Sequence, residues 1–175
     1  MKRTARVVLV GALLLMLGAG AALAATIECT GGLCEGTNRN DTLLGTGDFD
    51  EINGRGRHDE IFGRSGGDIL RGDFNDNPSA VEGNDKVRGG LGRDFLLGEG
   101  GDDLLDGGDN NDFIDAKDPS SGNTDTVEGG GGRDEIESTD GEADVIDCGP
   151  GIDTVRFDRR FDQVQNCENK DPFPS

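Results

Sequence analysis

The sequence has few of the residues that build an ordinary globular core. It contains no Trp or Tyr, and hydrophobic residues make up only 32% of its 175 positions. A typical soluble domain is nearer half apolar. A single large packed core is therefore not expected.

Positive charge is also scarce. The chain has 17 Lys and Arg against 36 Asp and Glu, which gives a formal net charge of −19. Nucleic acids and anionic membranes repel such a chain, so neither is an expected partner. The composition fits either a disordered acidic chain or a repeat protein that needs cations to fold.

The first 24 residues have the pattern of a secretory signal peptide. Lys2, Arg3 and Arg6 precede an apolar run over 7–17, and the small residues that follow end in Ala22-Leu23-Ala24, a small-x-small cleavage site. We expect cleavage after residue 24, a secreted, extracellular chain, and no membrane insertion afterwards. An uncleaved anchor is the alternative, because residues 7–27 carry no charge and are long enough to span a bilayer.

The four cysteines form two groups, Cys29 with Cys34 and Cys148 with Cys167. Neither spacing is a tight Cys-x-x-Cys and the chain has a single His, which argues against a zinc site. An even number of cysteines in an oxidising compartment favours disulfides. We expect the local bonds Cys29–Cys34 and Cys148–Cys167, although two other pairings are compatible with the sequence.

A nine-residue repeat starts at Gly36 and accounts for most of the chain. Nine units have no insertion, among them GGLGRDFLL (89–97) and GEGGDDLLD (98–106), and three units with insertions cover 72–88, 116–128 and 138–147. The sixth position of all twelve units is Asp and the eighth is aliphatic. The aspartates are Asp41, Asp50, Asp59, Asp68, Asp85, Asp94, Asp103, Asp112, Asp125, Asp134, Asp144 and Asp153.

Each unit predicts a turn followed by a short strand. Positions 1–4 are rich in Gly and polar residues that favour turns, and in a strand over positions 7–9 only position 8 points to the interior. Two units complete a coil, so the twelve repeats predict an all-β solenoid of about six coils over 36–156. Residues 25–35 and 157–168 are expected to cap its ends, and 169–175 to form a flexible tail.

These units resemble the hemolysin-type calcium-binding repeat family, whose consensus GGxGxDxUx is matched by GGLGRDFLL. The resemblance implies a parallel β-roll that holds Ca²⁺ between stacked Gly-Asp turns. The stretch CGPGIDTVRFDRRFDQVQNCE (148–168) also looks like the disulfide-closed end of small secreted members. Larger members carry a catalytic or pore-forming domain beside the repeats, and we expect none here.

Calcium requires six to eight oxygen ligands, which carboxylates and turn carbonyls supply together. All even-numbered repeats are nine residues long, whereas odd-numbered repeats contain every insertion and place Arg39 and Arg57 at position 4. We therefore expect several calcium ions along the edge formed by the even repeats, and a larger effect from losing Asp94 than Asp59. The candidate ligands are Asp50, Asp68, Asp94, Asp112, Asp134, Asp153 and Asp103, with Gly63, Gly66, Gly89, Leu91, Gly92, Gly107, Asp109, Gly129, Gly131 and Gly132.

The sequence favours a secreted calcium-binding protein that folds outside the cell and has a structural or adhesive role toward an extracellular or cell-surface partner. We expect no enzyme, because HExxH and GxSxG motifs are absent and His58, the single imidazole, lies in a repeat turn. A polysaccharide-binding or hydrolytic accessory protein is the alternative. Ile69, Phe95 and Phe113 predict an apolar stripe on the even repeats, either exposed as a partner surface or covered by the insertions.

Overall fold

A computed structural model describes residues 24–73, 81–119 and 121–173. The predicted signal peptide lies outside this part of the chain, apart from Ala24. Across these three ranges, no helix has the length and apolar character needed to cross a membrane.

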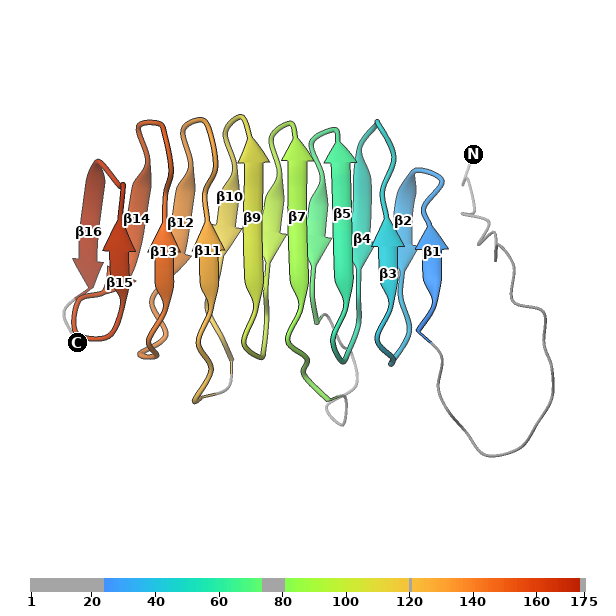
Figure 1. The fold of residues 1–175 in the computed structure, drawn as a ribbon, viewed down its shortest axis with the longest axis horizontal. Helices are drawn as coiled ribbons and strands as arrows, with labels where there is room; N and C mark the ends of the chain where they lie inside the picture. Colours follow the sequence, from blue (N-terminus) through green and yellow to red (C-terminus); the bar gives the residue numbers. More distant parts are fainter. Residues whose placement is uncertain (1–23, 74–80, 120, 174–175) are drawn as a thin grey trace.

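The described chain forms sixteen short strands in two parallel sheets, and consecutive strands alternate between the sheets. The first sheet contains β1 (Thr26–Glu28), β3 (Thr42–Leu44), β5 (Glu60–Ser65), β7 (Lys86–Leu91), β9 (Leu104–Asp109), β11 (Thr126–Glu128), β13 (Val145–Asp147) and β15 (Gln163–Gln165). The second contains β2 (Gly32–Glu35), β4 (Asp50–Asn53), β6 (Ile69–Arg71), β8 (Phe95–Leu97), β10 (Phe113–Asp115), β12 (Glu135–Ser138), β14 (Thr154–Asp158) and β16 (Asn169–Phe173). Each pair of strands makes one coil of a solenoid (Figure 1).

The predicted all-β solenoid is confirmed, but it has about eight coils rather than six. The twelve repeats supply β3 to β14, and each end adds two strands. The sequence 157–165, FDRRFDQVQ, is a further nine-residue unit with Asp162 and Val164 at positions 6 and 8, but without a glycine to mark it. Residues 169–173, expected as part of a flexible tail, instead form β16, which pairs with β14.

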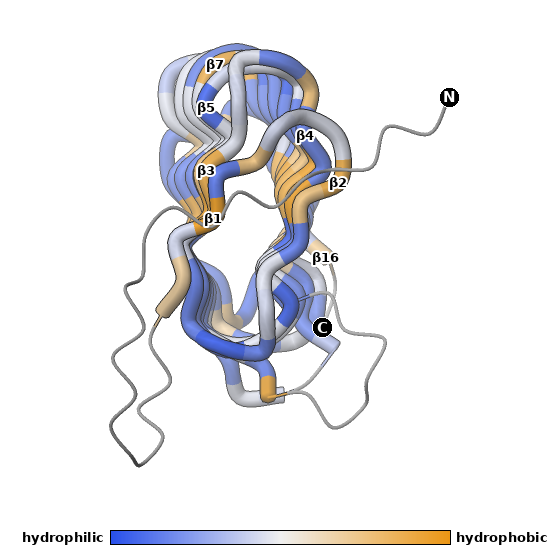
Figure 2. The backbone as a smooth tube through the Cα atoms, turned by 90° about the vertical axis from the view of Figure 1, so that its right-hand side faces the viewer, coloured by the Kyte–Doolittle hydropathy of each residue, from blue (hydrophilic) through white to orange (hydrophobic). Residues whose placement is uncertain are grey.

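The core is a double column of aliphatic side chains between the two sheets. The eighth residue of every repeat is at most 1% exposed, while its strand neighbours point outward and are more exposed. Viewed along the solenoid, these residues align as two facing hydrophobic bands, and the turns are mostly hydrophilic (Figure 2). Because only one large side chain per repeat is buried, the core is thin along its whole length.

The outward faces carry side-chain ladders between neighbouring coils. Half-exposed ion pairs bridge adjacent strands, and such pairs contribute little individually to stability. They join Arg55 to Glu35, Arg71 to Glu51, Arg88 to Glu60, and Lys117 and Arg156 to Glu137.

The predicted apolar stripe lies on the second sheet. Ile69, Phe95 and Phe113 pair in adjacent strands, and the two Phe rings stack with centroids 4.8 Å apart. All three side chains are half-buried. The stacking of Phe95 on Phe113 covers one face of each ring.

The two expected disulfides are present, and each lies at one end of the solenoid. Cys29–Cys34 joins the turn after β1 to β2, and Cys148–Cys167 joins the last repeat to the segment before β16. The described cysteines are therefore all paired, as predicted.

Loss of the C-terminal disulfide is expected to destabilise the chain more than loss of the N-terminal one. The cystines close loops of 19 and 5 residues. The loop-entropy relation gives about 3 kcal/mol for the longer loop and about 2 kcal/mol for the shorter. Denaturant unfolding in saturating calcium of the Cys148→Ala/Cys167→Ala and Cys29→Ala/Cys34→Ala variants measures the difference, and a greater loss for the N-terminal pair would contradict this ranking.

Candidate calcium sites

The turns of the repeats stack along two opposite edges. Turns of even-numbered repeats, here called the even edge, include 63–67, 89–93, 107–111, 129–133 and 148–152, and lie at the top of Figure 1. Turns of odd-numbered repeats, the odd edge, lie at the bottom and include the described parts of the insertions. The alternation that the sequence predicted is therefore confirmed.

The sixth-position aspartates form a hydrogen-bonded ladder along each edge. All twelve are at most 4% exposed. In ten of them, one carboxylate oxygen, Oδ1, accepts the backbone N–H of the aspartate in the preceding coil, as from Asp68 to Asp94 at 2.7 Å and from Asp94 to Asp112 at 2.8 Å. Backbone amides therefore fix the orientation of these carboxylates in the folded chain.

Two acidic residues outside the twelve repeats continue the ladders at the C-terminal end. Asp162 Oδ1 accepts from Asp144 N at 3.1 Å on the odd edge, and Glu168 Oε2 accepts from Asp153 N at 3.0 Å on the even edge. Neither residue is among the predicted ligands. The unit FDRRFDQVQ signals Asp162, whereas Glu168 follows a shortened turn that breaks the nine-residue spacing.

The second carboxylate oxygen, Oδ2, is buried without a hydrogen-bond partner in nine of the twelve aspartates. A buried, unpaired carboxylate oxygen is costly unless a cation or a proton compensates it. These nine orphan oxygens belong to Asp59, Asp68, Asp85, Asp94, Asp103, Asp112, Asp125, Asp134 and Asp153.

Seven of the nine orphan oxygens belong to repeats whose position 1 is glycine, whereas Ala116 and Cys148 occupy that position in the repeats of Asp125 and Asp153. A Cβ placed on Gly89 would lie 2.5 Å from Asp94 Oδ2 and 2.4 Å from the carbonyl oxygen of Gly107 in the next turn. The same pair of oxygens flanks Gly63, where the distances are 2.7 Å to Asp68 Oδ2 and 2.6 Å to the Gly89 carbonyl. A carboxylate and a stacked carbonyl thus converge beside both glycines.

Burial strongly disfavours the charged form of these carboxylates. It raises the pKa of Asp112 to about 7, that of Asp85 to about 8 and that of Asp103 to about 10. Neighbouring carboxylates raise the pKa of each further, with Asp94 and Asp134 acting on Asp112. A divalent cation beside these groups would offset both effects.

Hydroxyl groups take the place of a cation at some ladder positions. Thr37 donates from its backbone N–H and its Oγ1 to Asp41 Oδ2, both at 2.7 Å, and Ala25 N donates to the other oxygen of Asp41. Ser138 Oγ likewise donates to Asp144 Oδ2. These two aspartates therefore have no orphan oxygen.

Asp50, a predicted ligand, has one hydrogen-bonded carboxylate oxygen and one orphan oxygen. Thr46 satisfies its Oδ2 with two hydrogen bonds, at 2.6 and 2.9 Å, while its Oδ1 is buried without a partner because no aspartate precedes it on the even edge. Its environment thus differs from that of the even-edge aspartates further along the chain.

The even edge has the more regular backbone. The strand pairing of β5, β7 and β9 continues into the turns, where Ser65 pairs with Leu91 and Leu91 with Asp109. Asp109 in turn forms a β-bridge to Gly131. Positive φ recurs at positions 2 and 4, as at Gly90 and Gly92, which is natural for glycine. The backbone carbonyls that are predicted to bind calcium in repeats 4, 6, 8 and 10 therefore lie in register.

The sequence predicts poorer calcium sites on the odd edge, but the carboxylates there resemble those of the even edge. Asp59 has the same orphan oxygen as Asp94, and Arg57 adopts φ 75° at the position that glycine occupies in other turns. The expected contrast between Asp94 and Asp59 therefore does not follow from carboxylate geometry. Arginine at that φ is strained, which remains a local difference between the turns.

Carboxylates alone do not complete any of these sites. In the part of the chain that the structure describes, no three His, Cys, Asp or Glu side chains come together as a ready-made metal cage. Backbone carbonyls must therefore supply much of the shell, and this mixture of hard oxygens suits Ca²⁺. The orphan oxygens and the glycine-lined spaces fit that ion.

The family comparison agrees with this chemistry. The family described as RTX calcium-binding nonapeptide repeat matches residues 35–70, 79–114 and 120–155. The chain belongs to this family, and with its solenoid fold it is a calcium-binding β-roll protein. Searches of curated proteins and of solved structures find no significant match.

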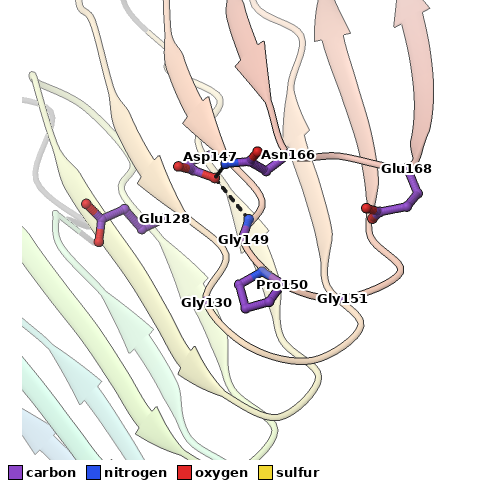
Figure 3. A pocket seen from close by; sticks show the side chains of 8 residues that line it. All are labelled: Glu128, Gly130, Asp147, Gly149, Pro150, Gly151, Asn166 and Glu168. Atoms are coloured by element: carbon purple, nitrogen blue, oxygen red, sulfur yellow. Dashed lines mark hydrogen bonds between the residues drawn. The ribbon is translucent and has the colours of Figure 1, made fainter.

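A groove of about 620 Å³ lies where the last repeats meet the C-terminal cap, with Glu128, Asp147 and Glu168 on its walls (Figure 3). Asp147 Oδ1 accepts from Gly149 N at 3.0 Å and from Asn166 Nδ2 at 2.8 Å. The three carboxylates lie apart in Figure 3. Asp147 therefore serves to attach the cap to the last repeat.

Gly89→Ala is expected to impair both stability and calcium affinity, because its methyl group would fill the space between Asp94 Oδ2 and the Gly107 carbonyl. Overpacking of this kind costs about 1–3 kcal/mol. Gly47→Ala is the matched control, since a Cβ there meets nothing within 4 Å and Gly47 has no positive φ. Calcium titrations followed by circular dichroism compare the two, and equal midpoints would contradict the role given to Gly89.

Proposed function

We propose that the protein is secreted, folds on binding several calcium ions outside the cell, and acts there as a non-enzymatic structural or adhesive module. The nine orphan carboxylate oxygens carry this proposal. They are buried and held by backbone amides, and six of them lie near a carbonyl oxygen of a stacked turn, so a bound ion would cross-link one coil to the next.

Folding should depend on these ions because the apolar core is thin and the acidic chain repels itself. The core has one large buried side chain per repeat, and the acidic residues outnumber the basic ones by 36 to 17. Self-repulsion of the buried carboxylates opposes the compact state until cations neutralise it. Millimolar extracellular calcium suits sites of the usual extracellular affinity, with dissociation constants of about 10⁻⁴ to 10⁻³ M.

The even edge is proposed to carry the most uniform series of sites. Its turns are all of equal length and their backbones pair continuously from repeat 4 to repeat 8. Sites between such turns should have similar affinities. On the odd edge the insertions make each position different.

An extracellular location is supported by the signal-peptide pattern and by the two disulfides, which form in oxidising compartments.

A non-enzymatic role is supported by His58, whose Nδ1 accepts a hydrogen bond from Asn84 N at 2.7 Å within the stacked turns. This imidazole therefore has a structural use in the odd edge.

Isothermal titration calorimetry of the chain without residues 1–24 tests the proposal. Several calcium ions should bind per chain, with little heat from magnesium at the same concentrations, because Mg²⁺ demands a tighter octahedral shell. A chain that binds no calcium in the millimolar range would refute it.

A further inference from the structure

The aspartate ladder of the odd edge continues one step before the first repeat, to Ala25. β1 pairs in register with β3, which places Ala25 opposite Asp41. Ala25 N donates to Asp41 Oδ1 at 3.1 Å, just as Asp41 N donates to Asp59 Oδ1 at 2.7 Å. The Ala25 carbonyl accepts from Thr42 N at 2.7 Å. Ala25 therefore occupies the sixth position of an incomplete repeat whose strand is β1.

Ala25 is also the first residue of the chain that the predicted cleavage would release. Cleavage after Ala24 converts the amide N–H of Ala25 into an α-amino group, whose ordinary pKa of about 7.7–8.0 keeps it mostly charged at neutral pH. The place that now donates a neutral hydrogen bond to Asp41 would then hold a cation. Cleavage at any other bond would put the new charge elsewhere.

Asp41 is well placed to pair with such a cation. It is 3% exposed, and its Oδ2 accepts from the backbone N–H and the Oγ1 of Thr37. Ala25 N is the donor to its Oδ1. All three donors are neutral groups, so a buried carboxylate has no opposite charge among its hydrogen-bond partners. An ammonium group at Ala25 would supply that charge, and charge-assisted hydrogen bonds are about twice as strong as neutral ones.

A groove of about 240 Å³ beside Ala24 provides space for this group. Ala24 is exposed and Ala25 is half-buried, so the remaining N–H groups of an ammonium at Ala25 could reach water. The titratable groups that line the groove are Asp41, His58, Asp59, Glu60 and Lys86. Because three carboxylates face one lysine, the groove favours a cation.

The N-terminal end of the even edge already has a cation from the chain itself. Arg64 Nη1 donates to the carbonyl oxygen of Gly45, in the first even turn, at 2.9 Å. In a later turn the corresponding carbonyl, that of Gly107, faces the orphan oxygen of Asp94. The first turn of an edge has a neighbour on one side only, so a positively charged group of the chain can end the ladder there.

We propose that removal of the signal peptide after Ala24 makes the α-ammonium of Ala25 a built-in cation that pairs with buried Asp41 and ends the odd-edge ladder without calcium. A signal peptidase adds water across the Ala24–Ala25 bond, which leaves a carboxylate on the released peptide and the ammonium on the mature chain. The inference rests on the secretion that the proposed function includes. The first coil is then more stable in the mature chain than in the precursor, so processing favours folding.

The α-amino pKa of the calcium-loaded chain that begins with Ala25 tests this pairing by NMR titration. A neighbouring carboxylate favours the charged amine, so the pKa should lie about one to three pH units above its ordinary value. The same chain begun one residue earlier, at Ala24, is the matched control, and its α-amino group should titrate in the ordinary range. Equal pKa values in the two chains would overturn the inference.

Hydrogen exchange gives a second measurement. Acetylation of the Ala25 α-amino group removes the charge but keeps an N–H donor. Protection of the Thr42 amide, which donates to the Ala25 carbonyl, should fall about tenfold, while that of Phe113 in the middle of the solenoid is unchanged. The calcium midpoint should move little, because the loss is shared among all the ions that bind. Unchanged protection of Thr42 would refute the pairing.

Mass spectrometry of the chain exported from a secreting host separates the two possible failures. The first residue should be Ala25. A chain that is exported but begins at another residue would overturn the inference and leave the proposed function intact. A precursor retained in the cell would contradict the proposed secretion as well.

Discussion

Chelation of calcium is expected to convert the mature chain from a β-rich to a largely coil-like far-UV circular dichroism spectrum. The nine orphan carboxylate oxygens would then be buried without any positive partner, and the chain escapes that cost by unfolding. Millimolar calcium should restore the β signal.

Magnesium supplies the control for this experiment. At the same ionic strength it screens the acidic chain as calcium does, but it dehydrates reluctantly and fits the carbonyl-rich turns poorly. Recovery with calcium and little recovery with magnesium would show that the turns coordinate an ion. Full recovery with magnesium or with sodium chloride would point to charge screening instead.

Asp94→Asn is the substitution from which we expect the largest rise in the calcium midpoint for folding. Asp94 lies in the centre of the even edge, and its orphan Oδ2 faces the space beside Gly89. Asparagine keeps an acceptor for the Asp68 N–H but removes the charge. Sites on both sides of this turn should weaken, by about tenfold for the loss of one charged ligand.

Asp41→Asn is the matched control, since Asp41 occupies the same repeat position but both its oxygens are already hydrogen-bonded by Thr37 and Ala25. The calcium midpoint of this variant should stay close to that of the unmodified chain. Calcium titrations of both variants by circular dichroism give the comparison. A shift for Asp41→Asn as large as that for Asp94→Asn would mean that orphan oxygens do not mark the metal ligands.

The repeat predicted the fold well because position sets environment in a solenoid. Asp at position 6 and an aliphatic residue at position 8 recur every nine residues, and stacking gives each the same burial in every coil. The ends were harder to predict. Asp162 and Val164 keep the pattern without a glycine, and β16 follows a shortened turn. The repeat pattern therefore does not predict the coil that β15 and β16 form.

The candidate sites were only partly predictable, because the state of each carboxylate depends on its immediate neighbours. Thr37 satisfies Asp41, and its signal in the sequence is a Thr directly after the first glycine of the repeat. The orphan oxygen of Asp59 could not be inferred from Arg57, which adopts the turn conformation despite its side chain.

Anomalous diffraction from crystals of the mature chain grown in calcium tests the central claim most directly. The account predicts calcium peaks between stacked turns of the even edge, beside Oδ2 of Asp68, Asp94, Asp112 and Asp134, and none at Asp41, whose oxygens are occupied by hydrogen bonds. Calcium found only on the outer faces of the sheets, with the orphan oxygens contacting no ion, would contradict it.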